Sequence, residues 1–324
     1  MTDFKEADNK DWRKILRTEL ITGIIGNQQG KNDAMAQIGY YYMCFAPTFL
    51  YKYYGDKIEK LGTVKAEKMW YSAPCNFNDV FDCDLTIDEN EIFNCALQML
   101  PDKRGVRPRS PMWRQLKQTI SREIRSLRAT FEHMKTTMGI SCLSESDDSL
   151  LMWAHYANNH RGMCVEYELL EISRQLGFSP VPVIYSNERS IFRSINQDTI
   201  EKDTMSALIE SITSKSPEWS YEREWRIIRD NGACGANWDT EKKGALLDMI
   251  RPTSVILGCM ATPEFERMIH EYCENSKINL YKMEKDTYLY KLKKFLFYSL
   301  MTEYKYAEYI KLTSTKNEGT SREG

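Results

Sequence analysis

Hydrophobic residues recur along this chain with two different periods, and the clearest helical pattern lies between residues 111 and 138. Its apolar positions are three or four residues apart, the spacing that brings side chains onto one face of an α-helix. They are Trp113, Leu116, Ile120, Ile124, Leu127, Phe131 and Met134. Shorter patterns predict helices over 12–25, directly after 145–148, and over 263–275. The polar run 27–32 after the first of these predicts a loop.

Short apolar runs between turn-forming residues predict β-strands. The predicted strands cover 50–54, 68–72, 139–144, 163–167, 182–185, 219–227, 254–258 and 278–282. Helices and strands are interspersed without an internal repeat, so we expect an α+β fold with a mixed or antiparallel sheet core and flanking helices. We expect residues 1–45 to be an N-terminal helical appendage, 46–300 a single α+β domain and 311–324 a disordered tail.

The segment from Trp219 to Arg226, Trp-Ser-Tyr-Glu-Arg-Glu-Trp-Arg, carries the most distinctive chemistry. Side chains alternate across a strand, so its tryptophans would face the core, and Glu222 and Glu224 would share the opposite face. Two carboxylates about 7 Å apart on one face suit a positively charged ligand or transition state. The alternative is a solvated edge strand, or a helical turn with an ion pair between Glu222 and Arg226.

Composition limits the classes of protein. With 324 residues, 42% of them hydrophobic, the chain is long enough to bury a core, and its net charge of −2 argues against a surface built wholly for nucleic acid. Nine cysteines without a CxxC pair indicate neither a disulfide framework nor a zinc ribbon, which favours the reducing cytoplasm. We expect no signal peptide and no membrane span.

Residues 101–135 are locally basic, with ten basic residues against three acidic ones. Such an excess could contact the phosphate backbone of a nucleic acid. The ordinary alternative is a solvated outer face over which the arginine side chains are spread.

Several enzyme classes lose support from the motifs. His155 and His160 lie about 140° apart around a helix, so they cannot share a metal ion. No glycine-rich phosphate loop, Gly-x-Ser-x-Gly elbow or recognisable cysteine nucleophile is present. What remains are polar and aromatic residues near strand ends: Lys52, Tyr53, Ser72, Asn78, Asp79, Ser141, Ser144, Trp153, His155, Tyr156, Glu222 and Glu224.

The order of these elements resembles that of mono-ADP-ribosyltransferases. A strand with a basic or aromatic residue comes first, a serine-bearing strand that leads into a helix follows, and a strand with Glu-x-Glu comes last. The resemblance implies a split sheet and NAD as substrate. Glu224 would hold the ribose 2′-hydroxyl and stabilise an oxocarbenium-like cation, while Glu222 would orient or deprotonate the acceptor. The arginine of the first motif in one branch is absent, and Lys52, Tyr53 and Tyr54 stand in its place.

The same resemblance implies supporting roles. Ser141 or Ser144 would support Glu224, and Tyr71, Trp153 or Tyr156 would stack on nicotinamide. The expected catalytic residues are Glu224, Glu222, Ser141 and His155, and those expected to bind NAD are Lys52, Tyr53, Tyr71, Ser144, Trp153, Tyr156 and Asn78.

A second resemblance, to the bacterial domain-of-unknown-function family numbered 2971, covers roughly residues 50–285. It rests on Leu50-Tyr-Lys-Tyr53, Trp70-Tyr-Ser-Ala-Pro74, Phe77-Asn-Asp79, Phe81-Asp82, Ser141-Cys-Leu-Ser144, Leu151-Met-Trp-Ala-His-Tyr-Ala157, His160-Arg-Gly162 and Trp219–Arg226. The usual Asn-Asp-Pro-Phe is Asn78-Asp79-Val80-Phe81 here. The family name implies no reaction, and it implies a role in bacterial conflict or phage defence only loosely.

Two other functions stay open at this point. In a metal-dependent nuclease, Mg²⁺ would be held by Asp79, Asp82, Glu222 and Glu224, and the basic 101–135 segment would hold the nucleic acid. In a non-catalytic sensing or binding module, the aromatic residues would simply form the core.

Overall fold

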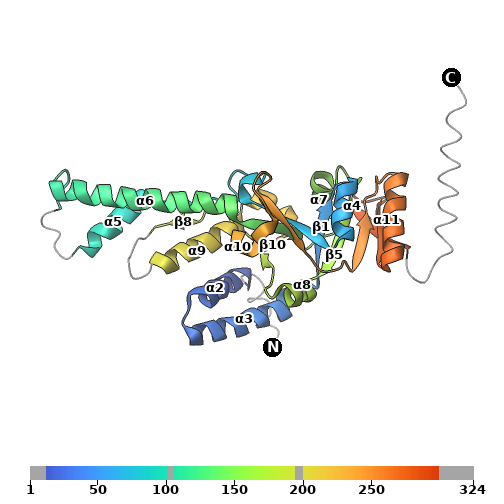
Figure 1. Cartoon of the computed structure of the whole chain (residues 1–324), viewed down its shortest axis with the longest axis horizontal. Helices are drawn as coiled ribbons and strands as arrows, with labels where there is room; N and C mark the ends of the chain where they lie inside the picture. The colour runs from blue at the N-terminus through green and yellow to red at the C-terminus, as the bar shows by residue number, and fades with distance from the viewer. Residues whose placement is uncertain (1–11, 101–105, 194–199, 299–324) are drawn as a thin grey trace, which may run out of the picture.

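The computed structural model describes residues 12–100, 106–193 and 200–298. It is an α+β structure in which one large mixed sheet is flanked by helices, as the sequence predicts (Figure 1). The tail expected over 311–324 lies outside the described residues.

The main sheet joins strands from all parts of the described chain. In spatial order they are β11 (Trp238–Asp239), β12 (Gly244–Asp248), β2 (Lys68–Ser72), β4 (Gly139–Ser144), β1 (Phe49–Tyr54), β5 (Met163–Glu168), β13 (Ser254–Leu257), β14 (Asn279–Lys285) and β15 (Leu292–Tyr298). Strand β10 (Glu224–Arg229) pairs with β4, and β6 (Val181–Pro182) pairs with β10. Within this sheet β13 and β14 run parallel, and the other pairs are antiparallel.

Two parallel pairs of short strands lie outside the main sheet. They are β3 (Thr86–Ile87) with β8 (Ile191–Phe192), and β7 (Ile184–Tyr185) with β9 (Ser214–Lys215). The single strand predicted over 182–185 is therefore divided between β6 and β7, which belong to different sheets.

The helices of the described residues are α2 (Trp12–Ile25), α3 (Gln28–Phe45), α4 (Ile58–Lys65), α5 (Glu89–Met99), α6 (Pro111–Thr137), α7 (Leu150–Tyr156), α8 (Leu169–Leu176), α9 (Ile200–Ile212), α10 (Asn231–Cys234) and α11 (Pro263–Ser276). Short 3₁₀ helices are η1 (Pro74–Asn76), η2 (Pro217–Glu222) and η3 (Gly235–Asn237). The four helices and six of the eight strands that the sequence predicts are confirmed to within a few residues.

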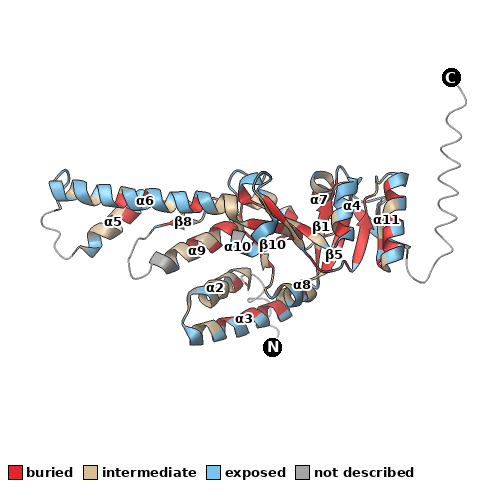
Figure 2. Ribbon diagram, viewed as in Figure 1, coloured by how far each residue is buried: buried red, intermediate tan, exposed pale blue. Residues whose placement is uncertain are grey.

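The two faces of the sheet carry different helices. Alternate residues of β1 point to opposite faces, so Leu50 belongs to one core cluster and Tyr53 to another. The larger core also contains residues of α2, α3, α4, α8 and α11, and the smaller one residues of α7. Buried strands lie between these helices (Figure 2).

The N-terminal helices belong to the larger core. The ring of Trp12 in α2 lies 6.1 Å from that of Trp225, and the ring of Tyr42 in α3 lies 5.9 Å from it. The sequence predicts a loop over 27–32, and this was wrong, because the side chain of Asn27 accepts a hydrogen bond from the Gly30 amide and starts α3 at residue 28.

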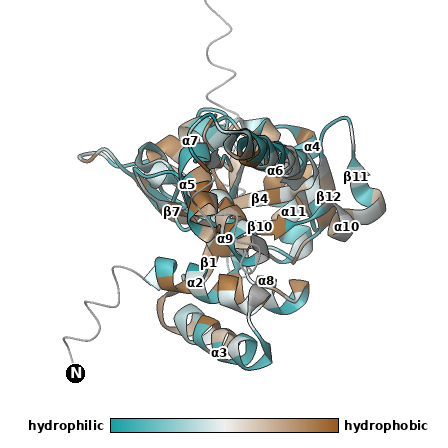
Figure 3. Ribbon diagram, turned by 90° about the vertical axis from the view of Figure 1, so that its left-hand side faces the viewer, coloured by the Kyte–Doolittle hydropathy of each residue, from teal (hydrophilic) through white to brown (hydrophobic). Residues whose placement is uncertain are grey.

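Helix α6 forms an arm that extends away from the sheet together with α5 and α9 (Figure 1). Figure 3 views the molecule from the end of this arm. The arm has its own hydrophobic cluster, which includes Ile92, Ile120, Ile124, Phe192 and Ala207. The apolar stripe read from the sequence is thus the face that α6 turns toward α5 and α9.

The main sheet is split at β4, where β1 and β2 lie along the same edge. Strand β10 pairs with β4 along the whole length of 139–144. Because a strand has only two edges, β1 and β2 must share the other edge of β4, and they meet it at opposite ends, at Ser144 and Ile140. Between these two contacts, the middle of β4 lies open on one side.

Candidate functional site

A cavity of about 410 Å³ opens at the split between β1 and β2. This volume lies within the range of pockets that hold small ligands, about 300–1,000 Å³. Its lining residues come from β1, β2, β4, η1 and the loop after it, α7, β9, η2 and β10. They are Tyr51, Lys52, Tyr53, Trp70, Ser72, Asn76, Phe77, Asn78, Asp82, Ile140, Cys142, Leu143, Met152, Tyr156, Lys215, Glu222 and Glu224.

The two glutamates reach this cavity by a different backbone path from the predicted one. The prediction of a continuous strand over 219–227 was wrong for its first half, because 217–222 forms the 3₁₀ helix η2 with a proline in its first turn. Arg223 follows with a left-handed backbone (φ 44°, ψ 53°), and β10 begins at Glu224. This turn brings both carboxylates toward one point, which a regular strand would not do.

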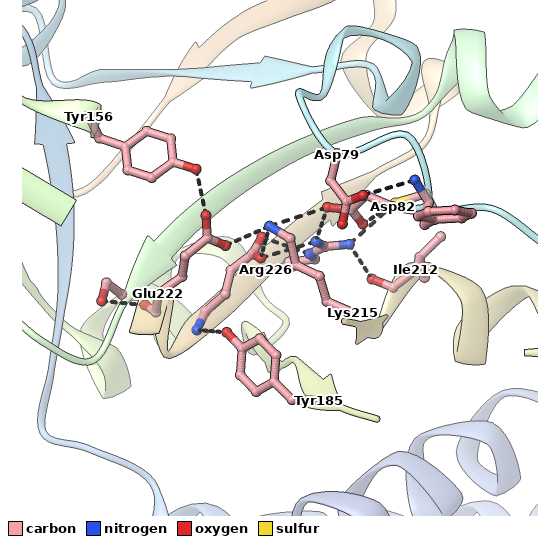
Figure 4. Close-up of polar contacts among 12 residues, drawn as sticks. Asp79, Asp82, Tyr156, Tyr185, Ile212, Lys215, Glu222 and Arg226 are labelled. Atoms are coloured by element: carbon pink, nitrogen blue, oxygen red, sulfur yellow. Dashed lines mark hydrogen bonds and ion pairs between the residues drawn. The ribbon is translucent and has the colours of Figure 1, made fainter. Parts of the chain in front are cut away.

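That point is the ammonium group of Lys215, a residue that the sequence did not single out. Its Nζ lies 2.5 Å from Glu222 Oε2 and 3.2 Å from Glu224 Oε2 (Figure 4). It also lies 3.5 Å from Asp82 Oδ2, and 4.8 Å from the ring centroid of Trp219. One buried cation therefore links three carboxylates.

Arg226 completes the network. Its Nε donates to Glu224 Oε1 at 2.8 Å, and its Nη2 donates to Asp82 Oδ2 at 2.7 Å (Figure 4). Its Nη1 donates to the carbonyl of Ile212 at 2.9 Å. Arg226 shares its strand face with Glu224, and Trp225 lies on the opposite face in the core, so the predicted alternation is confirmed for this half of the segment.

Neutral groups fix the backbone and one carboxylate. Ser144 Oγ donates to the carbonyl of Glu222 at 2.6 Å, and the hydroxyl of Tyr185 accepts from the Glu224 amide at 2.9 Å. The hydroxyl of Tyr156 donates to Glu222 Oε1 at 2.5 Å. These contacts hold both glutamates in place before any ligand binds.

The two glutamates have opposite shifts in pKa. Burial by itself raises the pKa of Glu224, but Arg226 and Lys215 hold it well below its usual range, so this carboxylate stays ionised. Burial and the charge of Glu224 raise the pKa of Glu222 above its ordinary value, against the opposing effect of Lys215. Three carboxyl groups face two cations here, and the charges balance when Glu222 carries the proton.

Lys52 lies in the split itself. Its Nζ donates to the carbonyl of Cys142 at 2.7 Å and to Ser141 Oγ at 3.3 Å. It thus supplies to β4 a donor that a strand partner would otherwise supply. Burial lowers the pKa of Lys52.

Replacing Lys52 by Met is expected to lower the free energy of unfolding by about 1–3 kcal/mol, the cost of leaving a buried carbonyl without its donor. Urea denaturation measures this change. The control is Lys68→Met, which removes only an exposed ion pair with Asp248 and is expected to cost less than about 1 kcal/mol. Equal losses in the two variants would contradict the role of Lys52 in the split.

The structure brings only some of the expected site residues to the cavity. Those that line it are Lys52, Tyr53, Asn78, Asp82, Tyr156, Glu222 and Glu224. Ser141 accepts from Lys52 instead of contacting Glu224, and Ser144 supports the backbone of Glu222. Both serines are buried behind the lining.

Tyr71, Trp153, His155 and Asp79 do not line the cavity. Tyr71 and Trp153 are fully buried in the two cores, where Trp153 Nε1 donates to the carbonyl of Asp147 at 2.6 Å. His155 is exposed, with its ring 6.1 Å from that of Tyr221. Asp79 Oδ1 accepts from the Phe81 amide at 2.9 Å.

Trp70 and Lys215 are two of the cavity residues that the sequence analysis missed, and they were missed for different reasons. Trp70 is the neighbour of Tyr71 in β2 and therefore faces the opposite side, so strand alternation would have found it once the core face was known. No pattern in the sequence pointed to Lys215, because it lies in the two-residue strand β9 and approaches the glutamates only in the folded chain.

The carboxylates do not surround a space for a metal ion. In the three described ranges, no three His, Cys, Asp or Glu residues are grouped so that they could hold one. Lys215 and Arg226 lie between Asp82 and Glu224, where the nuclease alternative would place Mg²⁺. Helices that could span a membrane are also absent from the part of the chain that the structure describes.

One protein-family model matches the segment that contains the two glutamates. Residues 152–227 match the family described as "Protein of unknown function (DUF2971)". The DUF2971 match includes Lys215, Glu222, Glu224 and Arg226, whereas Asp82 lies outside it. No curated protein and no solved structure matches the chain. The similarity to mono-ADP-ribosyltransferases therefore rests on the order of the sequence motifs alone.

Proposed function

We propose that the chain binds NAD in the split cavity and breaks the bond between nicotinamide and ribose, with transfer of ADP-ribose to an acceptor or to water. The observation that carries this proposal is the pair Glu222 and Glu224, held beside one cavity in environments that shift their pKa values in opposite directions. Two neighbouring carboxyl groups whose pKa values differ in this way are typical of enzymes that cleave glycosidic bonds.

The two glutamates divide the chemistry. When the C1′–N bond breaks, its electron pair leaves with nicotinamide, and the ribose acquires oxocarbenium character. Glu224 stays ionised at neutral pH and stabilises that positive charge. Glu222 in its deprotonated form takes the proton of the acceptor hydroxyl, or of water, as the new bond to C1′ forms.

The rest of the lining suits the same ligand. Five aromatic side chains, those of Tyr51, Tyr53, Trp70, Phe77 and Tyr156, offer surfaces for stacking. Lys52 also lines the cavity, but unlike Lys215 it does not belong to the carboxylate network. Its side chain forms no ion pair with another described residue. It supplies a donor for an anionic group of NAD.

The direct test is to incubate the purified full chain with NAD and to follow nicotinamide by chromatography. Release above the rate in buffer supports the proposal, and ADP-ribose in solution distinguishes transfer to water from transfer to the protein. The proposal would be overturned if NAD gave no release of nicotinamide and no shift in the melting temperature of the chain.

The acidic limb of the pH–rate profile is expected to lie above the ordinary carboxyl pKa, because Glu222 must lose its proton and its pKa is raised. Lys215→Met removes a cation that lowers the pKa of Glu222, so the limb should move to higher pH. Measurement of kcat/KM against pH decides this.

Lys215→Arg keeps a positive charge and serves as the control, with a limb close to that of the native chain. A limb that moves to lower pH in Lys215→Met would contradict the assignment of Glu222 as the base. Melting temperatures of both variants show whether they are folded over the pH range used.

The geometry of the site supports the nuclease and the non-catalytic binding module less well than it supports NAD cleavage. A magnesium-dependent nuclease would need carboxylates grouped around an ion, and among the residues that the structure describes no three His, Cys, Asp or Glu side chains are grouped in that way. A non-catalytic binding module would account for the aromatic core, but it gives no reason to bury three carboxylates beside a cavity. Cleavage of NAD distinguishes the proposal from both.

A further inference from the structure

An open groove of about 570 Å³ runs along the arm, on the surface of α6. All of its lining residues come from this helix: Trp113, Arg114, Lys117, Gln118, Ser121, Arg122 and Arg125. The four basic side chains are exposed to solvent. Lys117, Ser121 and Arg125 are four residues apart, so they form one row along the helix.

The charge of this groove is unbalanced. Residues 106–128 contain Glu123 as their one acidic residue, and seven basic residues, at positions 107, 109, 114, 117, 122, 125 and 128. Arg128 pairs with Glu89, but the four cations of the groove form no ion pair with any residue that the structure describes. Like charges three or four residues apart destabilise a helix by about 0.2–0.5 kcal/mol per pair. A bound polyanion would remove that repulsion.

An aromatic ring lies at one end of the groove. Trp113 is half-buried, and its ring packs edge-on against Phe93 with 5.7 Å between the centroids. Lys117 Nζ lies 5.0 Å from the centroid of the indole. A row of cations that ends in an accessible aromatic ring is the combination with which proteins bind single-stranded nucleic acids.

We infer that this groove binds the phosphodiester backbone of a single-stranded nucleic acid, with Trp113 as a stacking surface for a base. From Arg114 to Arg125 the helix rises by about 16 Å, a length over which one strand at B-form spacing presents about five phosphates. Each of the four cations can therefore meet its own phosphate. An acidic protein would match the charge but would make no use of the indole.

The groove and the cavity are separate sites. Trp113 precedes the end of α6 by 24 residues, about 36 Å of helix, and the sheet begins directly after that end. The inference therefore does not rest on the proposed NAD chemistry. Variants of the groove should leave nicotinamide release without nucleic acid unchanged.

The experiment is a titration of a fluorescein-labelled oligodeoxythymidine with the full chain, followed by anisotropy at several salt concentrations. Four phosphate contacts predict a slope of log K against log salt of about −3. Replacing Arg114, Lys117, Arg122 and Arg125 together by Gln should weaken binding at least tenfold and bring the slope close to zero. All four residues are exposed, so the variant should fold.

A matched control replaces Lys57, Lys60, Lys65 and Arg267 by Gln, which removes the same charge from exposed positions outside the arm. This control should keep both the affinity and the slope. An equal loss in the control would show diffuse attraction and would overturn the inference.

Two further measurements identify the ligand. Polyglutamate of similar length should compete poorly, and equal competition would replace nucleic acid by an acidic protein. Trp113→Leu should weaken binding of the single strand more than binding of a duplex. Equal effects on both would overturn the stacking role of Trp113.

Discussion

Replacing Glu224 by Gln is expected to lower the rate of nicotinamide release by about 10²–10³-fold, the loss seen when one preorganised electrostatic group is removed from an active site. Gln keeps the shape of the side chain but has no negative charge to stabilise the oxocarbenium-like ribose. Arg226 still donates to Asp82 and to the carbonyl of Ile212, so the fold around the site retains much of its support. The measurement is kcat for nicotinamide release at saturating NAD.

Glu266→Gln is the matched control for this prediction. Glu266 is 4% exposed, as Glu224 is, and it pairs with Lys282, but it lies on α11 and does not line the cavity. Its variant should keep the native rate. An unchanged rate in Glu224→Gln would remove the proposed mechanism, and equal losses in both variants would indicate a general effect on stability.

Replacing Arg226 by Met is expected to lower the free energy of unfolding by about 3–5 kcal/mol, because it leaves a buried carboxylate pair without its main cation. Arg226 is fully buried, and it binds both Glu224 and Asp82. Without it, Lys215 alone would face three carboxyl groups. Urea denaturation followed by circular dichroism measures the loss.

The double variant Arg226→Met with Glu224→Met separates charge imbalance from loss of packing. It removes one charge of each sign, so part of the stability lost in Arg226→Met should return. Arg229→Met, on the same strand, removes an arginine that packs 3.9 Å from the ring centroid of Phe178 and should cost less. A double variant less stable than Arg226→Met would show that imbalance is not the cause.

The buried network also explains how charged groups remain in this core. An isolated ionised group would be strongly unfavourable there, but Asp82, Glu222 and Glu224 alternate with Lys215 and Arg226, and most of their polar atoms are hydrogen-bonded. Cys142 lines the same cavity, and burial raises its pKa well above the usual range, so it stays a thiol. These features keep the negative charge of the site on the carboxylates.

Much of the secondary structure could be predicted from local sequence. The apolar stripe of α6 gave its limits to within one residue, and the runs that form β1, β4 and β13 were equally clear. Two of the errors involve residues that are common in turns. Asn27 caps a helix instead of opening a loop, and Pro217 starts a 3₁₀ helix ahead of the glutamates.

The site was less predictable because its residues meet through strand pairing. The sequence indicated Glu222 and Glu224 as a pair on one side of the chain, and Lys52, Tyr53 and Tyr156 as possible neighbours. It led us to expect Tyr71 in the site, whereas its neighbour Trp70 lines the cavity, because alternation places the two on opposite faces without saying which face is the core. It also gave no sign that Ser141 would bind Lys52 and not Glu224.

The sequence by itself determined the periodic elements and the presence of two closely spaced carboxylates, because periodicity depends on residues within a few positions of one another. Only the tertiary structure decided that β1 and β2 share one edge of β4, that a cavity opens between them, and that Lys215 and Arg226 neutralise the acids in its wall. The physical reason is that a buried charge is stable only beside its partners, and those partners are brought together by long-range pairing that no local pattern records.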